Sequence, residues 1–383
     1  MKRHFAVALL LFASLGIASP AFAGLSLEEH EARAKTMTVR EAYAAYEEWV
    51  TKESRYYAEP YAHRVYSLLK EAAALDEKHA KNLAQASLNY GRLLLSVNKR
   101  EQAEEILEEA LVLFQNQYGN DAPEVIDPLM DLGHAETKFL SGKTGGKYYR
   151  RAVEIAEKLE GEDSALVGQL YYEMAEQQLV MGAGKRNLAV SNLKKAYKIF
   201  QATLGENHGR TALASYRLGE LKKLDRRYDD AAEFLEAAVR VYDSGAPNER
   251  LTQRMHALLV ETYEKMGESD LATKHCQAVG RIKEANRDPV ETGESYEPLF
   301  LAQPKYPVSA QRRGLEGTVV LELTVTKDGR TSDFRVMERY GPDAFVKASI
   351  DAAKKFRYSA RHENGQPVDT TGVKYRFAFH LAD

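Results

Sequence analysis

Cysteine is almost absent from this sequence of 383 residues, in which Cys276 is the single example. One cysteine excludes an internal disulfide framework, and it also excludes a zinc site built from cysteines. Cys276 falls within an apolar helical pattern, which predicts a buried structural thiol and not a reactive one.

Long apolar runs are equally scarce, and the one candidate lies at the start of the chain. Basic residues at positions 2–4 precede an apolar segment at 5–17, and small residues follow at Ala21 and Ala23. This order is typical of a secretory signal peptide cleaved after Ala23, although an uncleaved membrane anchor is the alternative. The apolar run is shorter than the roughly 20 residues that a spanning helix needs. We therefore expect the first 23 residues to be removed and the remainder to be exported to the periplasm.

A basic excess is missing. The chain carries 53 Lys and Arg against 56 Asp and Glu, a formal net charge of −3. The predicted signal peptide contains Lys2 and Arg3 and no acid, so its removal leaves 51 basic and 56 acidic side chains, a net of −5. Nucleic acid as a partner requires a basic excess, and an anionic lipid surface requires a polybasic patch. The charge pattern therefore argues against both.

Catalytic motifs are missing as well. Gly142-Lys143-Thr144 resembles the end of a phosphate-binding loop, but Thr137 stands where the first glycine is required and no strand precedes it. We interpret this segment as a turn between helices. The histidines do not have the spacing of zinc ligands, and no nucleophile elbow is present. We expect no catalytic residues, no metal, no cofactor and no enzymatic activity; an active site assembled from residues distant in sequence remains the alternative.

What is present is a repeated spacing of small residues. Residues 38–286 are rich in Ala, Leu, Glu, Lys and Tyr and poor in proline. The predicted first helix of each repeat carries a small residue, and the predicted second helix carries alanines that follow it. The first-helix positions are Gly91, Gly133, Ala175 and Gly219. A second-helix alanine lies 23 residues before each of the last three, at Ala110, Ala152 and Ala196.

This spacing resembles the tetratricopeptide repeat family, in which small residues let paired helices approach closely. It predicts an α-helical solenoid over residues 24–286, with four clear repeats and degenerate ones at 38–76 and 251–285. An unrelated helical bundle is the alternative. The resemblance implies a concave groove that holds peptides or partner helices.

The pattern changes after residue 286. Residues 287–298 contain two prolines, a glycine and several acids, which indicates a linker. Alternation follows in residues 318–326, Asp328-Gly329 gives a hairpin turn signal, and a second strand is predicted at 332–339. Pro342-Asp343 marks the start of a helix. Its apolar face is formed by Phe345, Ala348, Ala352 and Phe356, and after an Asn364-Gly365 turn a last alternating strand carries Val373, Tyr375, Phe377 and Phe379. The predicted order is ββαβ, a small antiparallel sheet with one helix packed on it.

Several of these residues carry a second resemblance. Pro304-Lys305-Tyr306-Pro307 precedes Glu316-Gly317 at the start of a strand, and Phe356 and Tyr358 lie late in the predicted helix. With the two turns, this order over residues 299–383 resembles the C-terminal domain of the TonB family, although Phe356 stands where that family commonly has tryptophan.

The resemblance implies a mode of binding. TonB-type domains contact outer-membrane transporters, whose short extended segment adds as a strand beside the last strand of the domain. The implied partner-binding residues are Gln303, Pro304, Tyr306, Pro307, Val373, Tyr375, Phe377 and Phe379. The alternative for Tyr306 and Pro307 is that they fix the approach of the chain onto the sheet.

The two resemblances together predict a periplasmic TonB-like adaptor whose partners are an outer-membrane TonB-dependent receptor or another envelope protein. A link to an inner-membrane energy-transducing complex stays open. TonB itself has a membrane helix and a proline-rich spacer, and a solenoid stands in their place here, so we expect no energy transduction by this chain alone. The alternative is a structural scaffold for the cell envelope, with a tail that binds peptidoglycan or forms a homodimer.

Overall fold

The computed structural model describes residues 25–52, 54–136, 145–180, 182–245, 248–286 and 298–381. The predicted signal peptide, most of the predicted linker and the Gly142-Lys143-Thr144 turn lie outside these residues. The chain divides into two compact units, Met1–Ile155 and Ala156–Asp383. In the part of the chain that is described, no helix is both long and apolar enough to cross a membrane.

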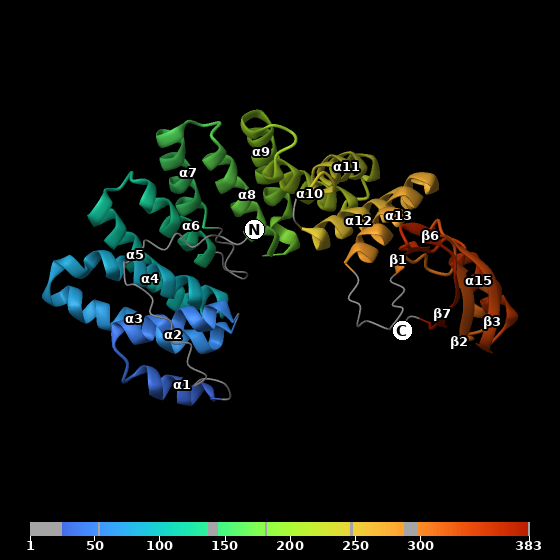
Figure 1. Cartoon of the computed structure of the whole chain (residues 1–383), viewed down its shortest axis with the longest axis horizontal. Helices are drawn as coiled ribbons and strands as arrows, with labels where there is room; N and C mark the ends of the chain where they lie inside the picture. The colour runs from blue at the N-terminus through green and yellow to red at the C-terminus, as the bar shows by residue number, and fades with distance from the viewer. Residues whose placement is uncertain are drawn as a thin grey trace. The chain divides into compact units, whose positions relative to one another are not determined.

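The first unit is helical (Figure 1). Its elements are α1 (Leu27–Ala34), α2 (Val39–Thr51), α3 (Arg55–Leu75), α4 (Ala80–Ser96), α5 (Arg100–Tyr118), α6 (Ile126–Ala135) and most of α7 (Gly146–Glu160), with single 3-10 turns at Glu77–His79 and Pro123–Val125. Ser26 and Thr38 begin α1 and α2 with complete capping boxes, formed with Glu29 and Glu41.

The second unit continues the helical hairpins and then changes to a small α+β domain, the tail domain. Its helices are α8 (Ala165–Val180), α9 (Arg186–Leu204), α10 (Gly209–Leu224), α11 (Tyr228–Asp243), α12 (Glu249–Met266) and α13 (Ser269–Ala285), with a 3-10 turn at Ala183–Lys185. The helix pairs α2–α3 and α12–α13 occupy the two segments predicted as degenerate repeats.

Packing between the helices of a pair explains the spacing of small residues. A Cβ atom added to Gly91 of α4 would lie 2.5 Å from the Leu107 Cγ of α5. A Cβ atom added to Gly219 of α10 would lie 2.7 Å from the Leu235 Cγ of α11, and Gly133 faces the Tyr149 ring in the same way. The alanines of the second helices are fully buried, at Ala103, Ala110, Ala152, Ala189, Ala196, Ala231 and Ala238. The helical-repeat prediction is therefore confirmed, because a larger side chain at either set of positions would separate the paired helices.

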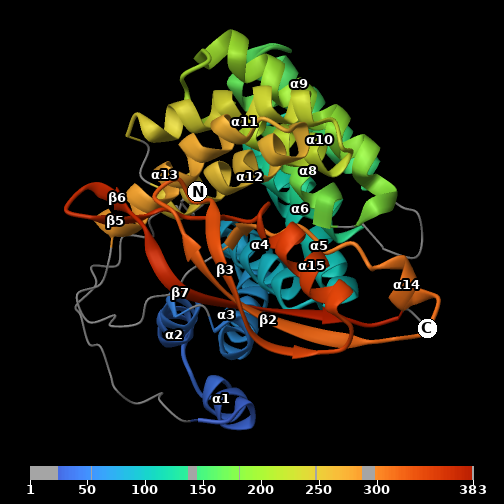
Figure 2. The same ribbon diagram turned by 90° about the vertical axis from the view of Figure 1, so that its right-hand side faces the viewer.

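The tail domain is built on a three-stranded antiparallel sheet in the order β3-β2-β7 (Figure 2). Its main elements are β2 (Gly317–Val325), β3 (Thr331–Tyr340), α15 (Asp343–Ala353) and β7 (Thr370–Phe379). The four apolar residues predicted to share one face of β2, namely Val319, Leu321, Leu323 and Val325, are at most 1 % exposed and form the core with Phe345, Phe356 and Phe377.

The ββαβ order is confirmed for these main elements, and the structure adds short ones. They are β1 (Pro298–Phe300), α14 (Val308–Gln311), β4 (Arg357–Tyr358), β5 (Arg361–Glu363) and β6 (Gln366–Val368). The predicted turns are also found: Gly329 has φ +71°, and the left-handed Asn364 and Gly365 connect β5 to β6.

One boundary prediction was wrong. Helix α15 ends at Ala353, so Phe356 and Tyr358 follow the helix and do not lie late in it. The reason is tertiary. β4 pairs with β1, and the Tyr358 amide donates to the Gly329 carbonyl at 2.9 Å. These partners lie far away in sequence, so helical periodicity alone could not locate the end of the helix.

Candidate functional site

Strand β7 is an edge of the sheet, because β2 is its one neighbour among the described residues. Its pairing with β2 keeps a constant register from Gly317–Phe379 to Leu323–Val373. The opposite edge, β3, changes register against β2 twice. Bulges interrupt and twist an edge, and proteins use them to prevent unwanted strand pairing. Of the two edges, β7 therefore presents the longer regular row of backbone N–H and C=O groups.

The predicted partner-binding residues of β7 face the interior of the domain. Val373, Phe377 and Phe379 are 6 %, 3 % and 2 % exposed, and the half-buried Tyr375 packs against Phe356 with 4.9 Å between ring centroids. A partner strand beside β7 would therefore meet the backbone of these residues. Their role in binding remains a prediction.

The other face of β7 carries a basic row. Lys374 and Arg376 are exposed there, and beyond Ala378 the exposed His380 directly follows the end of the strand, 3.7 Å from Glu316. Arg376 lies 3.7 Å from Glu338, but both side chains are about two-thirds or more exposed, so the pair contributes little. Side chains of a strand added beside β7 would lie next to this row.

The segment 303–307 reaches one end of the same strand. The Tyr306 hydroxyl donates to the Leu315 carbonyl at 2.6 Å. Its ring meets Phe345 and Phe379 edge to face, at 5.5 and 5.8 Å. Gln303 is exposed, whereas Pro304 and Pro307 are half-buried. The contacts of Tyr306 favour a structural role in fixing the approach of the chain, and Tyr306 is the member of this segment that they place against Phe379.

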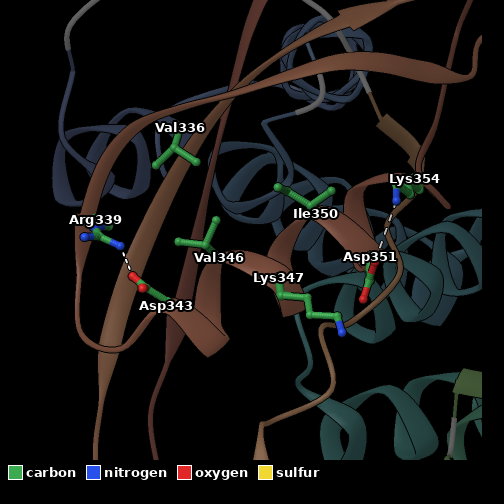
Figure 3. A pocket seen from close by; sticks show the side chains of 8 residues that line it. All are labelled: Val336, Arg339, Asp343, Val346, Lys347, Ile350, Asp351 and Lys354. Carbon is green, nitrogen blue, oxygen red and sulfur yellow. Dashed lines mark hydrogen bonds and ion pairs between the residues drawn. The ribbon is translucent and has the colours of Figure 1, made fainter.

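A groove that the sequence did not indicate runs between β3 and α15 (Figure 3). It is lined by Val336, Arg339, Asp343, Val346, Lys347, Ile350, Asp351 and Lys354. Its rim charges are largely paired with each other, Arg339 with Asp343 and Lys354 with Asp351. The available signal was an apolar pair in the second predicted strand, Val336 and Met337, whose side chains are 42 % and 49 % exposed in the structure.

The tail domain packs directly on the last helix pair through a buried ion pair. Arg357 of β4 lies 2.7 Å from Glu264 of α12, with side chains only 4 % and 8 % exposed. Phe300 of β1 packs against the apolar cluster that includes residues of α11, α12 and α13. The Lys265 ammonium lies 5.3 Å from the centre of the Phe300 ring.

Helix α13 meets the tail domain at close range. A Cβ atom added to Gly329 would lie 2.8 Å from the Cys276 Cβ, and the Ala360 amide donates to the Cys276 carbonyl at 3.2 Å. Gly280 leaves room for the backbone of Ala360 and for the Nδ1 of His362, which would lie 2.7 Å from an added Cβ. Cys276 is fully buried, and burial raises the pKa of its thiol to about 12. The prediction of a buried structural thiol is confirmed.

The first helices of the repeats in this unit carry a ladder of opposite charges. Arg217 of α10 lies 2.6 Å from Glu176 of α8 and 2.8 Å from Glu220, which also meets Arg254 of α12 at 2.8 Å. These charges neutralise one another, so the ladder does not favour a partner of either sign. Within the described ranges, no group of three or more His, Cys, Asp or Glu side chains is placed to hold a metal ion.

Comparison with known proteins finds a family match within each part of the chain. The family model for the Gram-negative bacterial TonB protein C-terminal region matches residues 302–381, and a tetratricopeptide repeat model matches 178–244. Protein TonB of Pseudomonas aeruginosa is 36 % identical over 80 residues, which are 21 % of this chain and 23 % of that protein. Protein TonB of Helicobacter pylori is 33 % identical over 79 residues, 21 % of this chain and 26 % of that protein. The chain thus spans about a quarter of the length of the TonB proteins it matches.

Two solved structures are also similar. The solution NMR structure of the P. aeruginosa TonB CTD has 31 % identity and a TM-score of 0.22, and covers 24 % of this chain and 93 % of its own. The crystal structure of BtubC (BKLC) from P. vanneervenii has 19 % identity and a TM-score of 0.49, and covers 71 % of this chain and 98 % of its own. The family matches show that the chain joins tetratricopeptide repeats to a TonB-type C-terminal domain, and domains of both kinds act by binding other proteins.

Proposed function

We propose that this chain is a periplasmic adaptor without enzymatic activity, which uses β7 to receive an extended segment of an outer-membrane receptor or another envelope protein. The observation that carries the proposal is the regular free edge of β7 in a TonB-type domain. Strand addition supplies affinity through backbone hydrogen bonds and selectivity through alternate side chains. The repeats bind a second protein and hold it close to the protein that is bound at β7. The signal-peptide pattern and the TonB resemblance support the periplasmic location.

The chemistry of β7 favours a partner segment of a particular kind. On one face, the partner's side chains would lie beside Lys374, Arg376 and His380. Opposite charges directly across two strands contribute about 0.2–1 kcal/mol each. The preferred segment is therefore extended, with acidic or polar residues at every second position. Gln303, Pro304, Tyr306 and Pro307 border the end of the site that contains Phe379.

Hydrogen exchange of the full chain tests this proposal. In the free protein, amides of β7 that point away from β2 exchange quickly; an added strand would protect them. Peptides that copy the periplasmic TonB-binding segments of outer-membrane receptors should protect Thr370–Phe379 and leave Thr331–Tyr340 unchanged. No protection of β7 at millimolar peptide, or protection of β3 instead, would contradict strand addition at β7.

The alternative is a scaffold that self-associates through the tail domain. It predicts that β7 becomes protected without any peptide as the protein concentration rises. Sedimentation velocity over the same concentration range then separates a homodimer from a complex with receptor peptides, because only the homodimer appears in the absence of peptide.

A further inference from the structure

A buried pair of histidines joins the helices that carry the tail domain. His256 of α12 and His275 of α13 are 2 % and 5 % exposed, and their Nδ1 atoms are 2.9 Å apart. Each ring also meets a carboxylate of α11. The Nε2 of His256 lies 3.1 Å from the Asp243 Oδ1, and the Nε2 of His275 lies 3.0 Å from the Glu236 Oε1. The Tyr263 hydroxyl donates to the same Glu236 oxygen at 2.9 Å.

The geometry fixes the number of protons in this cluster. An ionised carboxylate only accepts hydrogen bonds, so both Nε2 atoms must carry a proton. If both imidazoles were neutral, their Nδ1 lone pairs would face each other at 2.9 Å. If both were cationic, two N–H groups would face each other. A hydrogen bond forms between the rings only when one Nδ1 carries a proton and the other does not.

We infer that His256 and His275 form a proton-binding site that holds one proton between the two rings and joins α11, α12 and α13 most firmly in that state. The ligand is a proton, and the site is separate from the strand edge proposed for partner binding. The single positive charge of the pair lies between the carboxylates of Asp243 and Glu236. Because those carboxylates are 50 % and 35 % exposed, protons can reach the cluster from water.

The surroundings support a singly protonated pair. Burial is the main cause that lowers the pKa of His256; the charge of Asp243 acts in the opposite direction, and the charge of His275 acts in the same direction as burial. The hydrogen bond from His275 lowers the pKa of Glu236 to about 2, so the acceptor stays ionised. Lys274 and Glu268 are the other charged groups that act on Glu236 and Tyr263.

The site lies next to the surface on which the tail domain docks. His275 precedes Cys276, which contacts the Gly329 turn, and Tyr263 precedes Glu264, which pairs with Arg357. At two other positions of α13, Asp270 pairs with Arg330, and Gly280 lies against His362. Gain of a second proton or loss of the shared one would weaken the packing of α11, α12 and α13. The pH of the surroundings would therefore change how firmly the tail domain is held.

Hydrogen exchange of the α12 and α13 amides in the full chain, corrected for the intrinsic effect of pH, tests the proton count. Unfolded histidines titrate near pH 6.5. The closed pair holds one proton, whereas the two histidines of the open state hold two protons below that pH and none above it. Opening of the helices would therefore take up one proton below pH 6.5 and release one above it. The opening constant should therefore rise by up to tenfold per pH unit on each side of a protection maximum near pH 6.5.

His275→Phe supplies the matched comparison, with His63→Phe on α3 as the control because His63 is exposed. His275→Phe should abolish the rise on the alkaline side and keep the rise on the acid side, whereas the control should keep both. Two results would overturn the inference. One is an acid rise approaching a hundredfold per pH unit, which requires two neutral rings. The other is a wild-type protein without an alkaline rise, and this outcome is decisive even if the variant does not fold.

Discussion

Replacement of Arg357 by alanine should release the tail domain from the last helix pair. The substitution leaves the Glu264 carboxylate, 8 % exposed, without the guanidinium that lies 2.7 Å from it. Removing one partner of a buried ion pair is destabilising by about 3–5 kcal/mol, because the remaining charge stays buried. Docking should therefore weaken by about 3–5 kcal/mol, a factor of several hundred or more.

Cys276 reports this loss without any added label, because it is the single cysteine of the chain and is fully buried against the Gly329 turn. Its rate of reaction with a disulfide reagent, divided by the rate of the unfolded chain at the same pH, gives the fraction of time that the thiol is accessible. Arg357→Ala should raise this ratio several hundredfold. Hydrogen exchange of the same variant should show that the sheet of the tail domain remains intact.

Two further variants make the test specific. Arg339→Ala removes a pair with Asp343 whose side chains are 55 % and 84 % exposed, so its effect should stay within a few-fold. Replacing Arg357 by methionine and Glu264 by leucine together removes both buried charges and should restore most of the docking. If Arg357→Ala changes the Cys276 reactivity by less than about threefold, the buried pair does not hold the tail domain in place.

Three other outcomes are expected. Gly219→Ala places a Cβ 2.7 Å from the leucine side chain of α11, so the free energy of unfolding should fall by about 1–3 kcal/mol in urea denaturation. As the control for that substitution, Gly209→Ala, with no heavy atom within 4 Å of the added Cβ, should be neutral or slightly stabilising. Lys374→Glu should weaken binding of an acidic extended peptide by about two- to tenfold in isothermal titration calorimetry through reversal of a cross-strand charge pair, and equal weakening by Lys347→Glu on α15 would contradict a site at β7. The pKa of Glu236 is lowered to about 2, so the ionised carboxylate stabilises the fold above pH about 4.3, and this contribution is lost as the pH falls toward 2. In thermal unfolding between pH 2 and 6, Glu236→Gln should therefore lose less stability on acidification than the wild type.

Features that repeat or alternate over short distances could be predicted from local patterns of residues. The spacing of Gly91, Gly133 and Gly219 is readable because close helix packing imposes the same demand in every repeat. The alternation in β2 and β7 is readable because a strand with one buried face must place apolar residues at every second position. The turns at Gly329 and Gly365 follow from left-handed backbone geometry, which glycine adopts without strain.

Which of these features contact one another depends on how the whole chain folds. Arg357 and Glu264 appear in sequence as ordinary surface charges, and they become buried because β4 packs on α12. His256 and His275 appear as scattered histidines, and a helix hairpin brings their rings together. That β7 is the more regular edge follows from the sheet order and from bulges opposite β2, which no periodicity encodes. Pairing of distant residues depends on how whole elements pack, so local patterns could predict the helices and strands but not the contacts between them.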